Sequence, residues 1–158
     1  MKLLVTGGLG FIGSNFILKL LNETNEFDII NVDAELCGAN QKNLDSIKNH
    51  KKYEFVKGNI TNKRLMEELI SKCDAVVNFA AESFVDRSIN NADPFLVSNI
   101  RGAFTILDII TKQKKRMIQI STDEVFGSLS TGTADEQTKF NPSSPYAATK
   151  AAAELLIN

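Results

Sequence analysis

Two side chains near the end of the chain, Tyr146 and Lys150, have the types and spacing of an acid–base pair. Four residues apart on a predicted helix, they share one face, so an ammonium group would lie close to a phenol. The positive charge would stabilise the phenolate and lower the pKa of the phenol, which would make Tyr146 a base. The same spacing occurs by chance in many surface helices, so the pair needs support from other residues.

A second group of reactive side chains, Thr122, Asp123 and Glu124, follows directly after a predicted strand. The carboxyl ends of strands are where open α/β sheets bind ligands, so two carboxyl groups and a hydroxyl could meet a substrate there. Threonine and aspartate after a strand also cap turns, which is the alternative interpretation. No group of residues has the spacing of metal ligands, so the sequence predicts no metal site.

Glycines near the N-terminus predict a phosphate-binding turn. The run VTGGLGFIG at residues 5–13 fits the GxGxxG spacing as well as the GxxGxxG spacing. Missing side chains there would let backbone amides approach a pyrophosphate at the positive end of a helix. We expect Phe11 and Ile12 to anchor that helix on the sheet. The glycines of the turn are Gly7, Gly8, Gly10 and Gly13.

Asp33 predicts which dinucleotide binds. It ends the second predicted strand, twenty positions after Gly13. A carboxylate there can accept hydrogen bonds from the hydroxyls of the adenosine ribose, and it would repel a 2′-phosphate. Lys42 is the only basic residue between Ala34 and Asp45, so no cluster of positive charge favours NADP. The sequence therefore predicts NAD, and the alternative is a tight glycine turn with an aspartate at a strand end.

Alternating strands and helices would position these residues. Short apolar runs predict five strands, at residues 2–6, 28–33, 53–56, 75–81 and 117–121. Apolar spacing predicts helices at 11–21, near 44–47, at 62–71, from 94 onward and at 145–158, with a loop up to 141 before the last one. This alternation predicts an α/β fold of the Rossmann type, a doubly wound parallel sheet in a three-layer αβα arrangement, with residues 1–158 forming one NAD-binding domain.

Three further runs extend this interpretation: NFAAESFVDRSI at 78–89, ISTDEVFG at 120–127 and PYAATK at 145–150. In that order behind the glycine turn, they resemble the extended short-chain dehydrogenases, and most closely the dTDP-glucose 4,6-dehydratases. The resemblance covers the entire chain. It implies a nucleotide-sugar lyase that converts dTDP-glucose to dTDP-4-keto-6-deoxyglucose, with NAD as a recycled hydride carrier.

The resemblance also implies roles for individual residues. Tyr146 would take the proton of the sugar 4-hydroxyl while the C4 hydride passes to the nicotinamide, and Lys150 would bind the nicotinamide ribose. The resulting ketone acidifies the C5 hydrogen, so Glu124 would remove it, Asp123 would protonate the departing C6 hydroxyl and Thr122 would bind substrate. Hydride would then return to C6. The expected cofactor-binding residues are Gly7, Gly10, Phe11, Ile12, Gly13, Asp33, Asn59, Ile60, Ala80, Ala81, Tyr146 and Lys150.

Several positions depart from the family pattern. Asn59 stands where aspartate usually meets the adenine amino group, and its amide oxygen can still accept that hydrogen bond. Asn78, Phe84 and Phe126 replace His, His and Tyr, which removes polar groups near the nicotinamide end. Family members continue past the last helix into a smaller substrate-binding domain. The chain therefore resembles the N-terminal half of such an enzyme, and we expect it to be without the C-terminal substrate domain, as a truncation, a split gene product or a natural half-length homologue.

The resemblance to only the N-terminal half of the family members has a consequence for assembly. The fifth strand would be an open edge, which favours association with another chain. The apolar faces of the helices that begin near Pro94 and Pro145 pack together at a dimer interface in the family, and here they would lack cover. We therefore expect a homodimer or a larger assembly.

Composition indicates a soluble globular protein of the cytoplasm. Hydrophobic residues make up 43% and charged residues 23%, and 18 Lys and Arg nearly balance 19 Asp and Glu, so neither nucleic acid nor a membrane is an expected partner. Cys37 and Cys73 form no CxxC pair, so we expect buried thiols in a reducing compartment. No apolar run reaches the ~20 residues of a membrane span, and we expect no signal peptide.

Two other functions stay open on the sequence alone. Another extended short-chain dehydrogenase, such as a nucleotide-sugar 4-epimerase, needs the tyrosine, the lysine and NAD but not both carboxyl groups. A non-catalytic NAD-binding or assembly module needs only the cofactor site, and the missing substrate domain favours it. Asp123 and Glu124 are the residues that distinguish a dehydratase from an epimerase.

Overall fold

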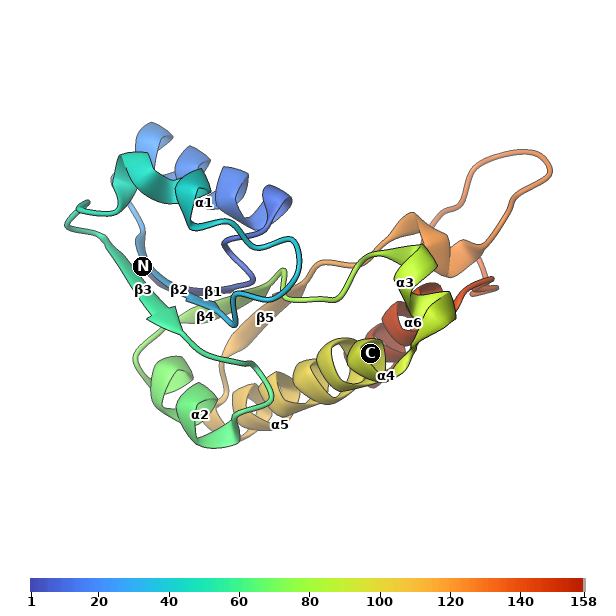
Figure 1. Ribbon diagram of the computed structural model, residues 1–158. Coiled ribbons are helices and arrows are strands. Elements are labelled where there is room, and N and C mark those ends of the chain that lie inside the picture. The colour runs from blue at the N-terminus through green and yellow to red at the C-terminus, as the bar shows by residue number, and fades with distance from the viewer. Residues whose placement is uncertain (158) are drawn as a thin grey trace. The chain divides into compact units, whose positions relative to one another are not determined.

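The computed structural model describes residues 1–157, which fall into two compact units (Figure 1). Unit 1 combines Met1–Ala80 with Thr105–Ile120. Unit 2 combines Ala81–Phe104 with the described residues from Ser121 onward. The predicted phosphate turn lies in unit 1, and the predicted acid–base residues lie in unit 2.

Unit 1 is built on a parallel sheet with the strand order β3-β2-β1-β4-β5. The order runs outward from β1 in both directions, which is the predicted doubly wound arrangement. In such sheets, ligands bind at the carboxyl ends of the strands where the order reverses, here between β1 and β4. The strands are β1 (Lys2–Thr6), β2 (Asp28–Asp33), β3 (Tyr53–Lys57), β4 (Ala75–Asn78) and β5 (Arg116–Gln119).

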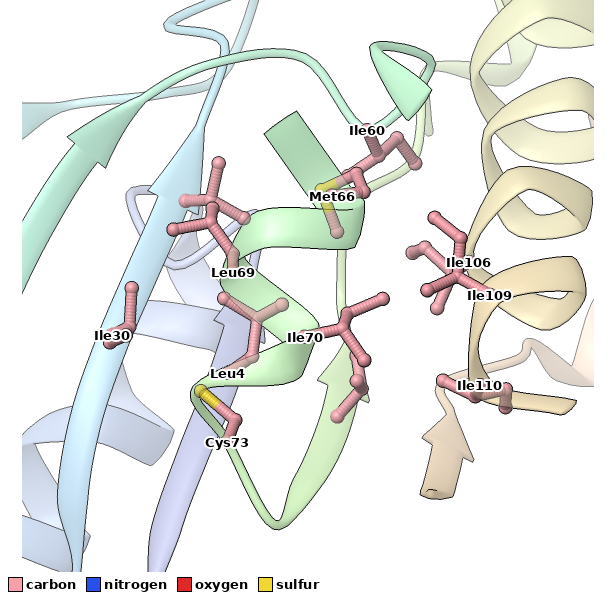
Figure 2. Close-up of a cluster of buried hydrophobic side chains, with 12 residues drawn as sticks. Leu4, Ile30, Ile60, Met66, Leu69, Ile70, Cys73, Ile106, Ile109 and Ile110 are labelled. Atoms are coloured by element: carbon pink, nitrogen blue, oxygen red, sulfur yellow. The ribbon is translucent and has the colours of Figure 1, made fainter. Parts of the chain in front are cut away.

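Helices cover both faces of this sheet, which confirms the three-layer prediction (Figure 1). On one face, α2 (Lys63–Ser71) and α5 (Ala103–Gln113) enclose the cluster of aliphatic side chains in Figure 2. On the other face, α1 (Phe11–Glu23) and η1 (Gln41–Ile47) pack on Leu3, Val5 and Ile29. Each fully buried aliphatic side chain stabilises such a core by about 1.5–3 kcal/mol.

Side-chain caps set the start of several helices. The Asn62 side-chain oxygen accepts the Leu65 N–H at 3.2 Å where α2 begins, and the Asn40 side chain caps η1 in the same way. At the start of the last helix, α6 (Pro145–Ile157), the Ser144 hydroxyl accepts the Ala147 N–H at 3.1 Å. Polar residues therefore stand directly before the first residues of α2, η1 and α6.

The predicted ends of three strands were wrong, and the smallest difference is at β3, which ends one residue later than predicted, at Lys57. β4 ends at Asn78, three residues early, because its partner β1 ends at Thr6 opposite Asn78. β5 ends at Gln119, which pairs with that same Asn78. The apolar residues that follow β4 lie in loops instead.

The helix predicted from Pro94 onward is interrupted. It begins as α4 (Asp93–Phe95), passes through the π-helical segment η2 (Leu96–Gly102) and continues as α5. A π-turn contains extra backbone per turn and so rotates the faces on either side of it. Phe95, before this segment, is buried, and Phe104, after it, is 52% exposed.

Two short helices were not predicted, α3 (Val85–Asn90) and η3 (Asp123–Phe126), because neither carries a long apolar period.

The expectation of two buried thiols was half right. Cys73 is buried, whereas Cys37 is exposed, and both are free. Among the residues that the structure describes, no helix is long and apolar enough to cross a membrane.

Candidate functional site

The glycine turn connects the end of β1 to the start of α1, and its main-chain atoms lie very close to other main-chain atoms of the fold. Gly7 has a φ of 68°, in the left-handed region, and a β-carbon added there would lie 2.6 Å from the Ala80 nitrogen. A β-carbon added at Gly13 would lie 2.5 Å from the Gly7 carbonyl oxygen. Both positions therefore require glycine for the turn itself to form.

Gly10 differs from these two glycines. Apart from its chain neighbours, the only described atom close to a β-carbon added there is the Gly7 carbonyl oxygen, at 3.4 Å. A side chain would fit the protein but would occupy the space beside the helix start. The amides of Phe11 and Ile12 are in the first turn of α1, where helix amides lack a partner within the helix. These donors and the open backbone suit a pyrophosphate.

The prediction that Phe11 and Ile12 anchor α1 on the sheet was wrong. Their side chains are 81% and 62% exposed. α1 starts after the turn that follows β1, so its first-turn side chains have no strand beneath them. Ile17 and Leu21, which are buried one and two turns later, hold the helix on the sheet instead.

Asp33 lies where the sequence predicted, at the end of β2 beside the glycine turn. Its Oδ2 accepts the Leu9 N–H at 3.0 Å, and its Oδ1 accepts the Glu35 N–H at 2.8 Å. The residue is buried, so these bonds fix the carboxylate in one orientation. Each oxygen retains a second lone pair that can accept a ribose hydroxyl.

The remaining predicted cofactor residues have more local roles. The Asn59 side-chain oxygen already accepts the backbone N–H and the hydroxyl of Thr61, at 2.9 and 2.8 Å, so a bond to adenine would require one of these to open. Ile60 is buried in the aliphatic cluster. The Ala80 N–H donates to a threonine hydroxyl at the end of β1, and Ala81 begins unit 2.

Unit 2 brings the predicted acid–base residues together. The Thr122 hydroxyl caps η3 by accepting the Glu124 N–H at 3.3 Å and donates to the Asp123 carboxylate at 3.3 Å. Tyr146, in the first turn of α6, forms a side-chain hydrogen bond with Thr122 and senses the charges of Glu124 and Asp123. A hydroxyl, two carboxyl groups and a phenol therefore lie near one another.

The pKa of the Tyr146 phenol differs in direction from the prediction. Burial raises the pKa, the hydrogen bond with Thr122 opposes that rise, and the negative charges of Glu124 and Asp123 raise it further. The prediction that a nearby ammonium lowers the pKa of Tyr146 was therefore wrong for the protein on its own. Helix spacing placed a lysine near the tyrosine but said nothing about burial.

Lys150 lies one turn after Tyr146 on α6 and is only 5% exposed. Burial lowers the pKa of its ammonium to about 8, and the charge of Glu154 opposes that fall. The Ser121 hydroxyl donates a hydrogen bond to Glu154. A buried lysine with a pKa near neutrality can gain and lose a proton under physiological conditions.

A buried polar network that the sequence did not reveal holds the start of α6. The Asn99 side chain exchanges two hydrogen bonds with the backbone of Glu82, each at 2.9 Å, and donates to the Thr149 hydroxyl at 3.0 Å. That hydroxyl donates to the Tyr146 carbonyl at 2.7 Å, and the Ser88 hydroxyl accepts the Tyr146 N–H at 3.1 Å. An asparagine within an amphipathic helix was the only signal in the sequence.

Fold and site together define a dinucleotide-binding α/β protein of the Rossmann type. The chain belongs to the family described as GDP-mannose 4,6 dehydratase, whose model matches residues 4–158. It is 42% identical over 160 residues to a dTDP-glucose 4,6-dehydratase of Mycobacterium tuberculosis, covering 99% of this chain and 48% of that protein. It is 43% identical over 158 residues to the low-salt glycan biosynthesis protein Agl12 of Haloferax volcanii, covering 99% and 51%.

Solved structures give the same result. A dTDP-glucose 4,6-dehydratase from Bacillus anthracis in complex with NAD matches with a TM-score of 0.88 and 42% identity, covering 99% of this chain and 49% of that one. The dTDP-glucose 4,6-dehydratase DesIV from Streptomyces venezuelae, with NAD bound, matches with a TM-score of 0.94 and 39% identity, covering 99% and 50%. The chain spans about half the length of the curated relatives it matches.

Proposed function

We propose that this chain provides the NAD-binding and acid–base residues of a nucleotide-sugar 4,6-dehydratase that acts on dTDP-glucose. The observation that carries the proposal is the grouping of Thr122, Asp123 and Glu124 beside the Tyr146 phenol in unit 2. An oxidation at C4 followed by loss of water needs one base for a hydroxyl and two carboxyl groups of opposite protonation state.

NAD as the cofactor is supported by the geometry of unit 1. Gly10 leaves the start of α1 open to a diphosphate, and the buried Asp33 carboxylate beside the turn can accept ribose hydroxyls. The same carboxylate would repel a 2′-phosphate. When bound, NAD supplies a hydride acceptor that is regenerated within each turnover.

The residues of the chain would then divide the proton transfers. Tyr146, as the phenolate, takes the proton of the C4 hydroxyl and becomes the neutral phenol, and the Lys150 ammonium stabilises the phenolate before that transfer. Once C4 is a ketone, Glu124 as a carboxylate removes the acidified C5 proton. Asp123 as a carboxylic acid protonates the C6 hydroxyl, which leaves as water.

The test is product formation by the full chain. Purified protein with NAD and dTDP-glucose is expected to give the 4-keto-6-deoxy product, detected by mass spectrometry. Asp123→Asn and Glu124→Gln should each keep NAD affinity and lower turnover by about 10²–10⁴-fold. Asp135→Asn, at an exposed loop carboxylate, is the matched control and should not change turnover.

Other outcomes select other functions. Intact turnover of dTDP-glucose in both carboxyl variants would contradict the dehydratase mechanism. A 4-epimer as the product would support an epimerase, a possibility favoured by the similarity to a UDP-glucuronic acid 4-epimerase of Bacillus cereus, which has a TM-score of 0.91 and 29% identity. NAD binding without any product would support a non-catalytic NAD-binding module.

We also propose that the protein is a homodimer or a larger assembly in the cytoplasm. The free thiols of Cys37 and Cys73 support a reducing compartment. Sedimentation that shows only monomer at micromolar concentration would contradict the assembly. The exposed apolar side chains of unit 2 that support association are Leu96, Val97, Phe104, Leu155 and Leu156.

A further inference from the structure

Asn31 is a fully buried amide in the middle of β2, between Ile30 and Val32. Its Oδ1 accepts the backbone N–H of Gly8 at 3.1 Å, and its Nδ2 donates to the Tyr53 hydroxyl at 2.9 Å. A buried amide costs free energy unless its polar atoms are bonded. Here the two bonds connect the glycine turn to β2 and β2 to β3.

Gly8 leaves space for this amide. A β-carbon added at Gly8 would lie 2.2 Å from the Asn31 Oδ1 and 2.6 Å from its Cγ. Gly7 has a positive φ and Gly8 does not, so Gly8 is required for space above Asn31 and not for its backbone angle. The Ile17 side chain approaches the same point at 2.6 Å, but its end can rotate away.

The turn therefore has two sets of amides with different partners. Asn31 and Asp33, both on β2, bind the amides of Gly8 and Leu9. The amides in the first turn of α1 have no partner within the helix and remain for a ligand. Side chains of β2 thus fix the segment from which α1 begins.

We propose that Asn31 is a positioning residue for the diphosphate of the dinucleotide. It acts through Gly8 and touches no ligand itself. By holding the Gly8 amide toward β2, it sets the direction in which the first-turn amides of α1 point. This inference rests on the proposed binding of NAD.

Asn31→Leu tests the role because leucine has a similar size but cannot accept the Gly8 N–H. The unpaired buried amide should displace the turn and raise the Kd for NAD about tenfold, the effect expected of one lost buried hydrogen bond. The affinity for adenosine, which has no diphosphate, should not change. Titration calorimetry gives the first value, and saturation-transfer NMR gives the second.

Tyr53→Phe is the matched control. It removes the other partner of Asn31 and leaves the Gly8 bond in place, so the Kd for NAD should stay within about twofold of the unaltered value. Equal loss of NAD affinity in Tyr53→Phe and Asn31→Leu would overturn the proposal, because general loosening of the core would then explain both. Equal loss of adenosine affinity and NAD affinity in Asn31→Leu would also overturn it.

An NMR measurement on the unaltered chain needs no variant to fold. The Gly8 amide should exchange slowly with solvent and shift little when NAD is added, whereas the Phe11 and Ile12 amides should shift strongly. A large shift of Gly8 would show that this amide binds the ligand, and it would overturn the role of Asn31. No NAD binding by the unaltered chain would contradict the proposed function itself, whereas NAD binding with an unchanged Kd in Asn31→Leu would contradict only this inference.

Discussion

The two units bury different kinds of side chain. The interior of unit 1 consists of large aliphatic residues such as Leu4, Ile70 and Ile106, all with 0% exposure. Among the described residues, unit 2 buries three ionisable side chains, Glu82, Tyr146 and Lys150, whereas those buried in unit 1 are the Asp33 carboxylate, held by two backbone amides, and the Cys73 thiol. Most of the buried apolar residues of unit 2 are small, namely Ala103, Ala147, Ala151 and Ala153.

The large aliphatic side chains that stabilise the fold therefore lie mainly in unit 1, whereas the proposed acid–base groups lie in unit 2. A pKa near 8 for Lys150 in place of 10.5 means that burying the ammonium costs about 3 kcal/mol at neutral pH. That cost is similar to the gain from burying one or two aliphatic side chains. Unit 1 can hold a rigid phosphate turn, whereas unit 2 holds reactive groups at the expense of its own stability.

The contrast in packing predicts the largest stability effect in unit 1. Ile70→Ala removes a fully buried side chain of α2 and leaves a cavity, so the free energy of unfolding should fall by about 4 kcal/mol. Urea denaturation followed by circular dichroism measures the change. Ile89→Ala on α3 in unit 2 is the matched control, because Ile89 is 66% exposed and its loss should cost under about 0.5 kcal/mol. Similar losses in the two variants would remove the contrast.

The glycine turn offers a matched pair of substitutions within unit 1. Gly13→Ala places a β-carbon 2.5 Å from the Gly7 oxygen, and we expect it to destabilise the fold by about 3 kcal/mol and to abolish NAD binding. Gly10→Ala meets no such contact, so the fold should keep its stability while NAD affinity falls. Thermal unfolding and titration calorimetry separate the two effects. Full NAD affinity in Gly10→Ala would show that the diphosphate does not lie beside Gly10.

Lys150 should make the stability of the protein rise with pH. Its pKa is lower in the folded state than in the unfolded state, so the unfolded chain binds the extra proton between about pH 8 and 10.5. Lys150 therefore lowers the free energy of unfolding most below pH 8. The free energy of unfolding should increase by up to about 2 kcal/mol as the pH rises to 9.5. Lys150→Met should be more stable at pH 7 and should lose this increase in urea titrations.

The control for this experiment is Lys19→Met, because Lys19 has a highly exposed side chain on α1. That variant should keep the rise in stability with pH and change the unfolding free energy by under about 0.5 kcal/mol. A rise that persists in Lys150→Met would assign it to another group and would contradict the buried ammonium in unit 2.

The smallest effect concerns the Tyr146 phenol. The chain has two tyrosines and no tryptophan, so a Tyr53→Phe background isolates the phenolate absorbance of Tyr146. Its pKa should lie above that of a free tyrosine, and Glu124→Gln should lower that pKa by removing a nearby negative charge. A Tyr146 pKa below that of free tyrosine in the protein without NAD would show that burial and the nearby carboxylates do not dominate.

Much of unit 1 could be predicted from the sequence because its signals are local. The runs at 2–6 and 28–33 are too apolar for a surface, and they became β1 and β2 with the predicted bounds. The glycine turn and Asp33 belong to one continuous unit of two strands, the turn between β1 and α1, and the helix α1, so the sequence motif predicted that they lie close together. Phe11 and Ile12 failed because helical spacing does not say where the sheet ends beneath a helix.

Unit 2 was less accessible to sequence reasoning. The sequence determined which residue types are available for chemistry, and it determined the strand and helix alternation that forms a doubly wound sheet. Only the tertiary structure decided that Lys150 is buried, that burial raises the pKa of Tyr146, and that Asn31 holds the Gly8 amide. The physical reason is that periodicity is a property of neighbours along the chain. Desolvation and hydrogen bonding depend instead on residues that are distant in sequence and meet only after folding.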